Sequence, residues 1–220
     1  MRAVILALAV TAGGCGGEPE VDVLVFSRTT SYRHAEAIEA GQAVLERRFG
    51  AVLTEDPARF SDDGLRDVDV VVLLQTNGPG VLRGEQRAAF ERWVRGGGGA
   101  VAVHAAANAD RDWPFYGELL GGARFESHRR GPLQREDVVV GHHPATEGLP
   151  RRWARRDEWY RFDPEPVADV VATVDGDPMA WATTIGRGRA FYTALGHAGA
   201  AWAEPLYRRH VFAAVEWAGR

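Results

Sequence analysis

A chain of 220 residues, 45% hydrophobic and 25% charged, is long enough to bury a substantial core as one domain. Its formal net charge of −4 gives no indication of nucleic-acid binding. All 26 basic residues are arginine, which excludes a Schiff-base lysine, a P-loop lysine and a Ser-Lys dyad. None of the four serines lies in a G-x-S-x-G motif, so an α/β-hydrolase nucleophile is not predicted either.

Residues 1–20 are predicted to be a secretory signal and a short tether. A basic residue follows Met1, residues 3–10 are apolar, and small residues precede Cys15, the only cysteine. This pattern resembles a bacterial lipobox, although Ala12 stands where leucine is usual. We therefore expect an exported cell-envelope lipoprotein, lipidated on Cys15, with its folded domain over 21–220. The alternative is a cytoplasmic protein in which residues 3–10 form a buried first strand.

Apolar runs and helical periodicity alternate along the first half of the domain. The expected strands cover residues 21–26, 51–54, 68–74 and 100–103, and the expected helices cover 35–49 and 84–95. Right-handed crossovers between such strands build a doubly wound, mostly parallel α/β sheet with helices on both faces.

The second half, from about Asp110, is less regular. Residues 178–185 and 189–194 flank Gly186-Arg187-Gly188, which predicts a β-hairpin. An amphipathic pattern over 204–217 predicts a closing helix. No internal repeat or linker divides the domain.

Three histidines come after expected strands of this sheet: His34, His104 and His197. Ligands of open α/β sheets bind beyond the carboxyl ends of the strands, so we expect these side chains to converge on one pocket. His104 is the best placed, because it follows four glycines (96–99) and the apolar run 100–103. The alternative for His104 is a purely structural residue that caps a loop.

The second half adds further ionisable candidates. His128 or Glu158 is expected to reach the same pocket, where Glu158 would be a general base or a metal ligand. The alternative for Glu158 is an ion pair with Arg155 or Arg156. His142 and His143 are adjacent, so at most one of them joins a site on an extended segment. His210 is expected on the surface or in the core, and no pair of histidines has the i, i+4 spacing of a helical zinc site.

Six motifs taken together resemble the ThuA-like (trehalose utilisation) family, from residue 21 to the end of the chain. They are Ser31-Tyr32-Arg33-His34, the segment 96–104, the segment 116–128, His143-Pro144-Ala145-Thr146, Asp157-Glu158-Trp159-Tyr160, and Gly186-Arg187-Gly188-Arg189 with 192–197 and Trp202. The resemblance implies the class I glutamine amidotransferase-like superfamily and a flavodoxin-like sheet. It carries over the following candidate site residues without individual roles: His34, His104, His128, His143, Glu158 and His197.

The resemblance also implies what the protein does not do. In amidotransferases of this fold a nucleophilic cysteine follows a central strand, whereas His104 stands at the equivalent place here. No cysteine follows Cys15, so thioester chemistry is not expected.

The resemblance further implies an enzyme that acts on trehalose or a related disaccharide, in particular a keto-sugar. The histidines and Glu158 would transfer protons, or would hold a divalent metal such as zinc that polarises a carbonyl. Substrate contacts are expected from Arg33, Asn77, Trp159, Tyr160 and Trp202. The expected partners are a small carbohydrate and, through Cys15, the membrane. Whether the chain forms a homo-oligomer is left open. The alternatives are a non-catalytic sugar-binding lipoprotein and a scaffold domain.

Overall fold

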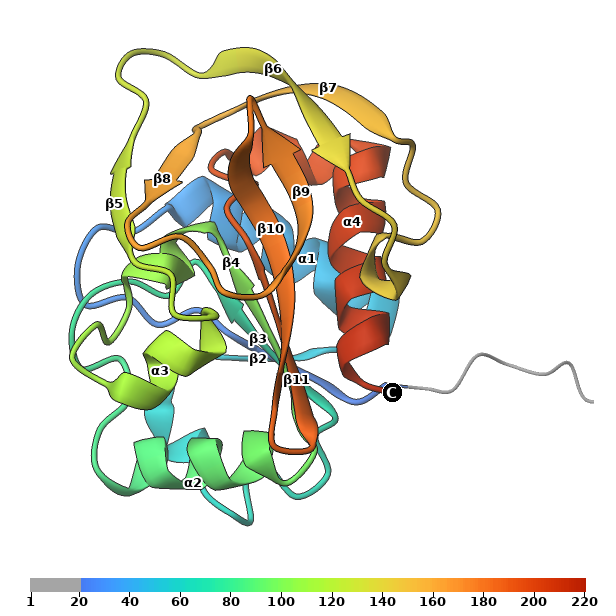
Figure 1. The fold of residues 1–220 in the computed structure, drawn as a ribbon. Coiled ribbons are helices and arrows are strands. Elements are labelled where there is room, and N and C mark those ends of the chain that lie inside the picture. Colours follow the sequence, from blue (N-terminus) through green and yellow to red (C-terminus); the bar gives the residue numbers. More distant parts are fainter. Residues whose placement is uncertain (1–20) are drawn as a thin grey trace, which may run out of the picture.

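The computed structural model describes residues 21–220, so the expected signal segment and Cys15 lie outside the described residues. A nine-stranded sheet crosses the molecule and helices cover it (Figure 1). Its order is β2-β1-β3-β4-β11-β10-β9-β6-β7, and a separate small sheet pairs β5 with β8. The strands are β1 (Val23–Phe26), β2 (Val52–Thr54), β3 (Val70–Leu74), β4 (Gly99–Val103), β5 (Phe125–His128), β6 (Gln134–Val140), β7 (Arg152–Asp157), β8 (Tyr160–Phe162), β9 (Asp169–Val174), β10 (Asp177–Ile185) and β11 (Gly188–Thr193).

The half of the sheet from β2 to β11 is parallel. Every residue of β1, β3 and β4 is buried, which is why these strands read as continuous apolar runs in the sequence. In the centre, Val101 of β4 lies opposite Val72 on one side and Phe191 on the other. The expected α/β architecture is therefore confirmed.

Within residues 21–220, four α-helices flank the sheet: α1 (Ala35–Phe49), α2 (Glu85–Arg95), α3 (Pro114–Leu119) and α4 (Pro205–Ala218). The helices α1 and α4 cover one face, and α2 and α3 lie on the other (Figure 1). Four short 3₁₀ turns join the elements: η1 (Pro57–Arg59), η2 (His104–Asn108), η3 (Pro144–Thr146) and η4 (Gly199–Ala203). The helix expected over 35–49 is confirmed as α1, with the same bounds. It ends at Gly50, whose φ of 65° is left-handed.

The other half of the sheet, from β11 to β7, is antiparallel. The expected hairpin forms from β10 and β11, and β9, β6 and β7 extend the sheet beyond it. The sheet is thus mixed, because hairpin connections in the second half replace helical crossovers. Within residues 21–220, no helix combines the length and apolarity needed to cross a membrane.

Candidate active site

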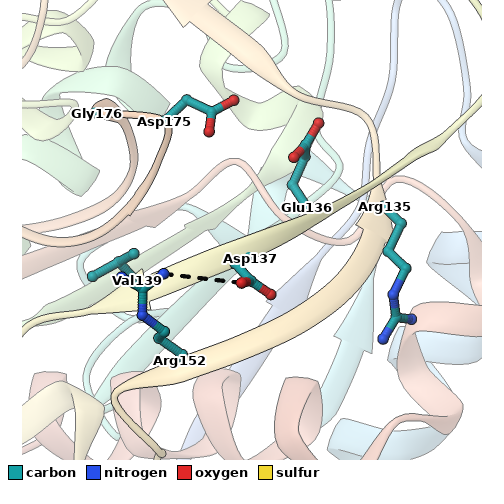
Figure 2. A pocket seen from close by; sticks show the side chains of 7 residues that line it. All are labelled: Arg135, Glu136, Asp137, Val139, Arg152, Asp175 and Gly176. Carbon is teal, nitrogen blue, oxygen red and sulfur yellow. Dashed lines mark ion pairs between the residues drawn. The ribbon is translucent and has the colours of Figure 1, made fainter.

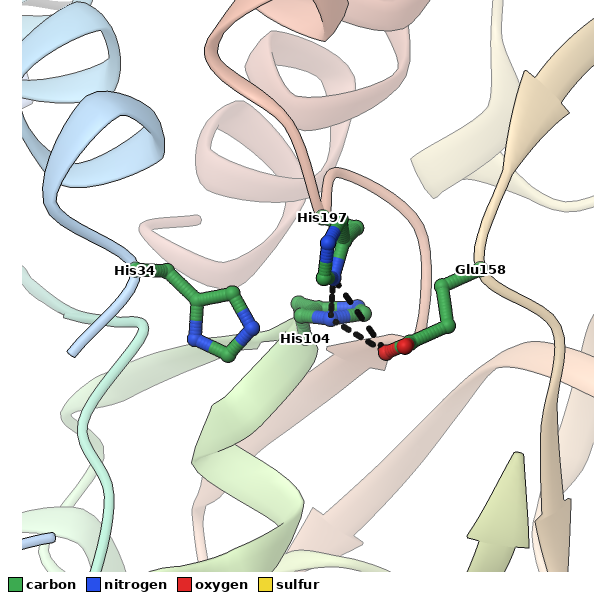
Figure 3. A group of neighbouring side chains, drawn as sticks. All are labelled: His34, His104, Glu158 and His197. Atoms are coloured by element: carbon green, nitrogen blue, oxygen red, sulfur yellow. Dashed lines mark hydrogen bonds and ion pairs between the residues drawn. The ribbon is translucent and has the colours of Figure 1, made fainter. Parts of the chain in front are cut away.

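Four ionisable side chains meet at the edge of the large sheet where β4 and β11 end (Figure 3). One ligand atom from each of His34, His104, Glu158 and His197 lies within 4.8 Å of the others. We call these four residues the histidine–glutamate cluster. His34 precedes α1, His104 follows β4, Glu158 follows β7 and His197 follows β11. Because β4 and β11 are adjacent and parallel, their carboxyl ends bring His104 and His197 together, as the sequence led us to expect.

The backbone at His104 is unusual, with a φ of 50°. Left-handed conformations cost a non-glycine residue of order 1–3 kcal/mol and persist where the surroundings fix them. The hydroxyl of Tyr192 donates to the carbonyl oxygen of His104 at 2.9 Å. The ring Nδ1 lies 2.5 Å from the carbonyl oxygen of Ala194. A carbonyl only accepts, so Nδ1 carries the hydrogen, and in the neutral ring Nε2 presents a lone pair to the cluster.

Nε2 of His104 faces three polar atoms. The Tyr160 hydroxyl lies at 3.0 Å, Nδ1 of His197 at 3.2 Å and Oε2 of Glu158 at 3.4 Å. The same Oε2 lies 3.2 Å from Nδ1 of His197. Burial raises the pKa of Glu158, but the two neighbouring imidazoles outweigh it and hold this pKa well below its ordinary range. Glu158 is therefore a carboxylate at neutral pH, and its contact with His197 raises the pKa of that imidazole.

His34 completes the cluster with a neutral imidazole. Burial, followed by the neighbouring His104 and His197, lowers the pKa of His34 to about 4. Its ring stands edge-on to the rings of His104 and His197, with centroids 5.1 and 4.9 Å away. Nδ1 of His34 is buried and has no hydrogen-bond partner. On the other side, the ring of Tyr32 contacts His34 at a centroid distance of 4.8 Å and is 68% exposed, so an aromatic surface lies beside the cluster.

Asp157 fixes the loops that carry two members of the cluster. Its carboxylate accepts the backbone N–H groups of Gly196, His197 and Glu158 at 2.8, 3.1 and 3.0 Å. Nη2 of Arg155 lies 2.8 Å from the same carboxylate, and both side chains are buried. Arg155 thus pairs with Asp157 and not with Glu158, which leaves Glu158 to the histidines. Sequence reasoning missed the supporting role of Asp157, because the segment Arg-Trp-Ala-Arg-Arg-Asp does not show which side chains of β7 are buried.

Gln75 is a second supporting residue of the cluster. It lies directly after β3 with a φ of 57°. Its Nε2 donates to the carbonyl oxygen of Gly196 at 2.8 Å, and its Oε1 accepts the N–H of Ala105 at 3.3 Å. It therefore ties the loop of His197 to the turn of His104, a role that no local sequence pattern indicates.

The remaining histidine candidates lie in different surroundings. Nδ1 of His128 lies 3.3 Å from Oε1 of Glu158, so His128 reaches the cluster from its more exposed side. His143 instead caps η3, where its Nδ1 accepts the N–H of Ala145 at 3.0 Å and its ring packs against Trp217. Burial lowers the pKa of His143, and the contacts of this ring are with the cap and the tryptophan.

Of the residues expected to contact substrate, some lie at the cluster and others do not. Tyr160 touches the cluster, whereas Trp159 and Trp202 are 1% and 2% exposed and offer no face on which a sugar ring could stack. Arg33 is held by Glu55 at 2.6 Å and by the carbonyl oxygen of Ser27 at 3.3 Å. Asn77 donates to the carbonyl oxygen of Tyr32 at 2.9 Å, so its amide positions the loop beside the cluster.

A hollow lies over β6 and β7 and is lined by Arg135, Glu136, Asp137, Val139, Arg152, Asp175 and Gly176 (Figure 2). Several of its charges are already paired. Arg152 lies 3.9 Å from Asp137, and Arg129 lies 3.1 Å from Glu136 and 2.8 Å from Asp175. The hollow shares no residue with the histidine–glutamate cluster.

Solved structures share this fold. A structure described as a ThuA-like protein from Bacteroides uniformis matches with a TM-score of 0.79 and 22% identity, over 95% of both chains. Another, from Parabacteroides merdae, matches with a TM-score of 0.72 and 23% identity, over 90% of both chains. A β-galactosidase from Bacillus circulans sp. alkalophilus matches with a TM-score of 0.60 and 15% identity, over 89% of this chain and 30% of that one. At these identities the likeness shows the fold alone.

The family model described as trehalose utilisation, ThuA, matches residues 22–218. The chain therefore belongs to the ThuA family, as its six ordered motifs led us to expect. No curated protein sequence matches the chain.

Proposed function

We propose that this protein is an enzyme of carbohydrate metabolism that acts on an oxidised sugar, such as a keto-disaccharide, at the histidine–glutamate cluster. The observation that carries the proposal is the cluster itself. Four ionisable side chains from separate segments meet within 4.8 Å, and His104 holds its place in a strained backbone conformation. Ionisable groups gathered in this way are typical of catalytic sites. The family description, trehalose utilisation, supports a sugar as the substrate.

A keto-sugar suits the groups that the cluster offers. A carbonyl acidifies the neighbouring C–H bond, so hydrolysis, elimination or isomerisation beside it needs a base and an acid in reach of adjacent atoms. His197, paired with Glu158 at 3.2 Å, can exchange a proton with the substrate. Burial raises the pKa of Tyr160 well above its ordinary value, so its hydroxyl stays protonated and can donate to an oxygen.

Amidotransferase activity does not belong to the proposal. Residues 21–220 contain no cysteine, so the chain lacks the thiolate that would form a thioester in this part of the fold. His104 stands directly after β4 instead.

Incubation of the purified full-length chain with trehalose and with its 3-keto derivative tests the proposal, with products followed by NMR. We expect turnover of the oxidised sugar, reduced about 10²-fold or more in Glu158→Gln and His104→Asn. Asparagine tolerates the left-handed backbone at position 104. His142→Asn is the matched control, because His142 is exposed and outside the cluster. Saturable sugar binding without turnover would favour the non-catalytic sugar-binding alternative.

We also propose that the enzyme is exported and held at the cell envelope by lipid on Cys15. The proposal is supported by the basic start, the apolar residues 3–10 and the small residues before Cys15. It places the sugar chemistry outside the cytoplasm and makes the membrane a partner.

A further inference from the structure

One contact of His104 within the cluster, the one with Glu158, has no hydrogen between its two atoms. Nδ1 of His104 uses its hydrogen on the carbonyl oxygen of Ala194. The Nε2 lone pair then accepts from the Tyr160 hydroxyl at 3.0 Å. It also faces the carboxylate of Glu158 at 3.4 Å, and neither of these two atoms carries a hydrogen. His197 has a single Nδ1 hydrogen to offer to both neighbours. Two electron-rich atoms held side by side in a half-buried site are stabilised by a cation placed between them.

The distances within the cluster match those between the ligands of a small metal ion. His104 Nε2, His197 Nδ1 and Glu158 Oε2 form a nearly equilateral triangle with sides of 3.2, 3.2 and 3.4 Å. Nitrogen and oxygen ligands about 2.0–2.1 Å from a tetrahedral metal lie roughly 3.3 Å from one another. The triangle therefore has the size of one face of a tetrahedral site.

His34 lies close enough to the triangle to be the fourth ligand. Its ligand atom lies within 4.8 Å of the other three, and its ring faces the rings of both His104 and His197. A neutral imidazole has a lone pair that it can give to an ion. Nδ1 of His34 is buried and has no hydrogen-bond partner. A bound ion could supply that partner if the ring of His34 turned toward it.

We propose that His34, His104, Glu158 and His197 bind one divalent first-row transition metal ion. Three imidazoles and one carboxylate suit zinc, iron, cobalt or nickel, whereas magnesium and calcium prefer oxygen ligands alone. Among residues 21–220 this is the only group of three or more histidine, cysteine and carboxylate side chains arranged to hold an ion. The catalytic use of the metal rests on the proposed function, where it would polarise the sugar carbonyl as a Lewis acid.

The surroundings of the cluster resemble those of established metal sites. Metal-bound histidines usually donate their other ring N–H to a carbonyl or a carboxylate, as Nδ1 of His104 does to Ala194. The second oxygen of Glu158 is held by His128 at 3.3 Å, and Asp157 holds the backbone of His197 at 3.1 Å. His128 and Asp157 are therefore positioning residues for the ligands.

Metal titration of the full-length chain tests the site without an activity assay. The chain is first treated with a chelator, and Zn²⁺, Co²⁺ and Mg²⁺ are added separately in a calorimeter, while visible absorption follows Co²⁺. We expect one equivalent of Zn²⁺ or Co²⁺, an intense Co²⁺ band typical of four-coordination, and no Mg²⁺ binding. His104→Asn and Glu158→Gln should weaken Zn²⁺ binding by more than the 10–100-fold typical of losing a supporting residue. His142→Asn should leave it unchanged.

The outcomes separate the metal site from the proposed function. Folding of each variant is checked by its thermal melt without metal, so a lost binding signal is not confused with a lost fold. Absence of saturable Zn²⁺ and Co²⁺ binding in the folded chain would overturn the metal proposal, as would wild-type affinity in both variants. Turnover of the sugar after complete chelation would show that the metal is not used in catalysis, while the proposed enzyme activity would stand. One tightly bound equivalent without turnover of any sugar would retain the metal and reject the substrate class.

Discussion

Asp157 is the residue on which the geometry of the cluster most depends outside the cluster itself. Its carboxylate accepts three backbone N–H groups and faces buried Arg155. An amide has one accepting oxygen and turns N–H groups toward the other donors. Asp157→Asn should therefore loosen the loop of His197 and leave buried Arg155 with only the more distant carboxylate of Glu204, 3.6 Å away. Breaking a buried pair costs about 3–5 kcal/mol.

For Asp157→Asn, chemical denaturation should give that loss of stability, and calorimetry below the melting transition should give a 10–100-fold loss of Zn²⁺ affinity. Asp175→Asn is a suitable control, because Asp175 pairs with Arg129 at 2.8 Å but is largely exposed. If Asp157→Asn is destabilised yet binds Zn²⁺ like the wild type, Asp157 supports the fold and not the site.

His210 provides a pH prediction away from the cluster. It is buried in α4, and its Nε2 lies 3.0 Å from the hydroxyl of Thr193. Burial, and then the charge of Arg155, lower its pKa to about 3. Below pH 6.5 His210 binds a proton in the unfolded chain but stays neutral in the folded chain. The free energy of unfolding should therefore fall by about 1.4 kcal/mol per pH unit between 6.5 and 3 on account of this residue.

His210→Gln keeps a partner for Thr193 and removes this proton. Between pH 7 and pH 5 the wild type should lose about 2 kcal/mol more stability than the variant, because 1.5 of those pH units lie below 6.5. Urea denaturation at the two pH values measures the difference, and exposed His142→Gln should behave like the wild type. Equal losses in wild type and His210→Gln would contradict the neutral, buried state of His210.

At the scale of single elements, the sequence predicted the parallel half of the sheet better than the antiparallel half. The strands β1, β3 and β4 are buried on both faces, so each appears as an uninterrupted apolar run. In contrast, β7 reads as Arg-Trp-Ala-Arg-Arg-Asp and looks like a charged surface segment. Only its pairing with β6 reveals that Trp153, Arg155 and Asp157 point inward.

The same contrast holds for the candidate site. Histidines after strands could be found because the carboxyl ends of parallel strands share an edge. The left-handed turn at His104 and the bonds to Ala194 and Tyr192 could not be predicted, because their partners lie about ninety residues away. Trp159 and Trp202 have no exposed face on which a sugar could stack, because both rings pack in the core.

The turn that begins β11 allows a sharp test of packing between elements. A Cβ at Gly188 would lie 2.0 Å from the carbonyl oxygen of Val94 and 2.6 Å from that of Gly98. Backbone atoms cannot move aside cheaply, so Gly188→Ala should destabilise the fold by roughly 3 kcal/mol. Gly117 lies in α3 with no atom near a Cβ built on it, so Gly117→Ala should gain about 0.5–1 kcal/mol. Thermal melts of both variants check the pair, and equal melting temperatures would contradict the close approach at Gly188.

At the scale of the whole molecule, the cluster is a product of topology. Its four residues span positions 34 to 197, and they meet only when the parallel and antiparallel halves of the sheet have both formed. Glu158 comes from the antiparallel half, and the two sheet histidines follow β4 and β11 in the parallel half. A bound ion would therefore join the two halves, and its binding free energy would add to the stability of the fold.

Cys15 is the proposed point at which the chain is anchored to the membrane. If Cys15 is lipidated after export, residues 1–14 are removed and two or three acyl chains hold the domain at the membrane, since one chain anchors only marginally. Mass spectrometry of membrane-extracted protein should then show a diacylated or triacylated Cys15 as the first residue. Cys15→Ser should release the protein while sugar turnover and Zn²⁺ binding stay unchanged, because no thiol belongs to the cluster. Recovery of the chain from the cytoplasm with Met1 or Arg2 intact would instead support the unexported alternative.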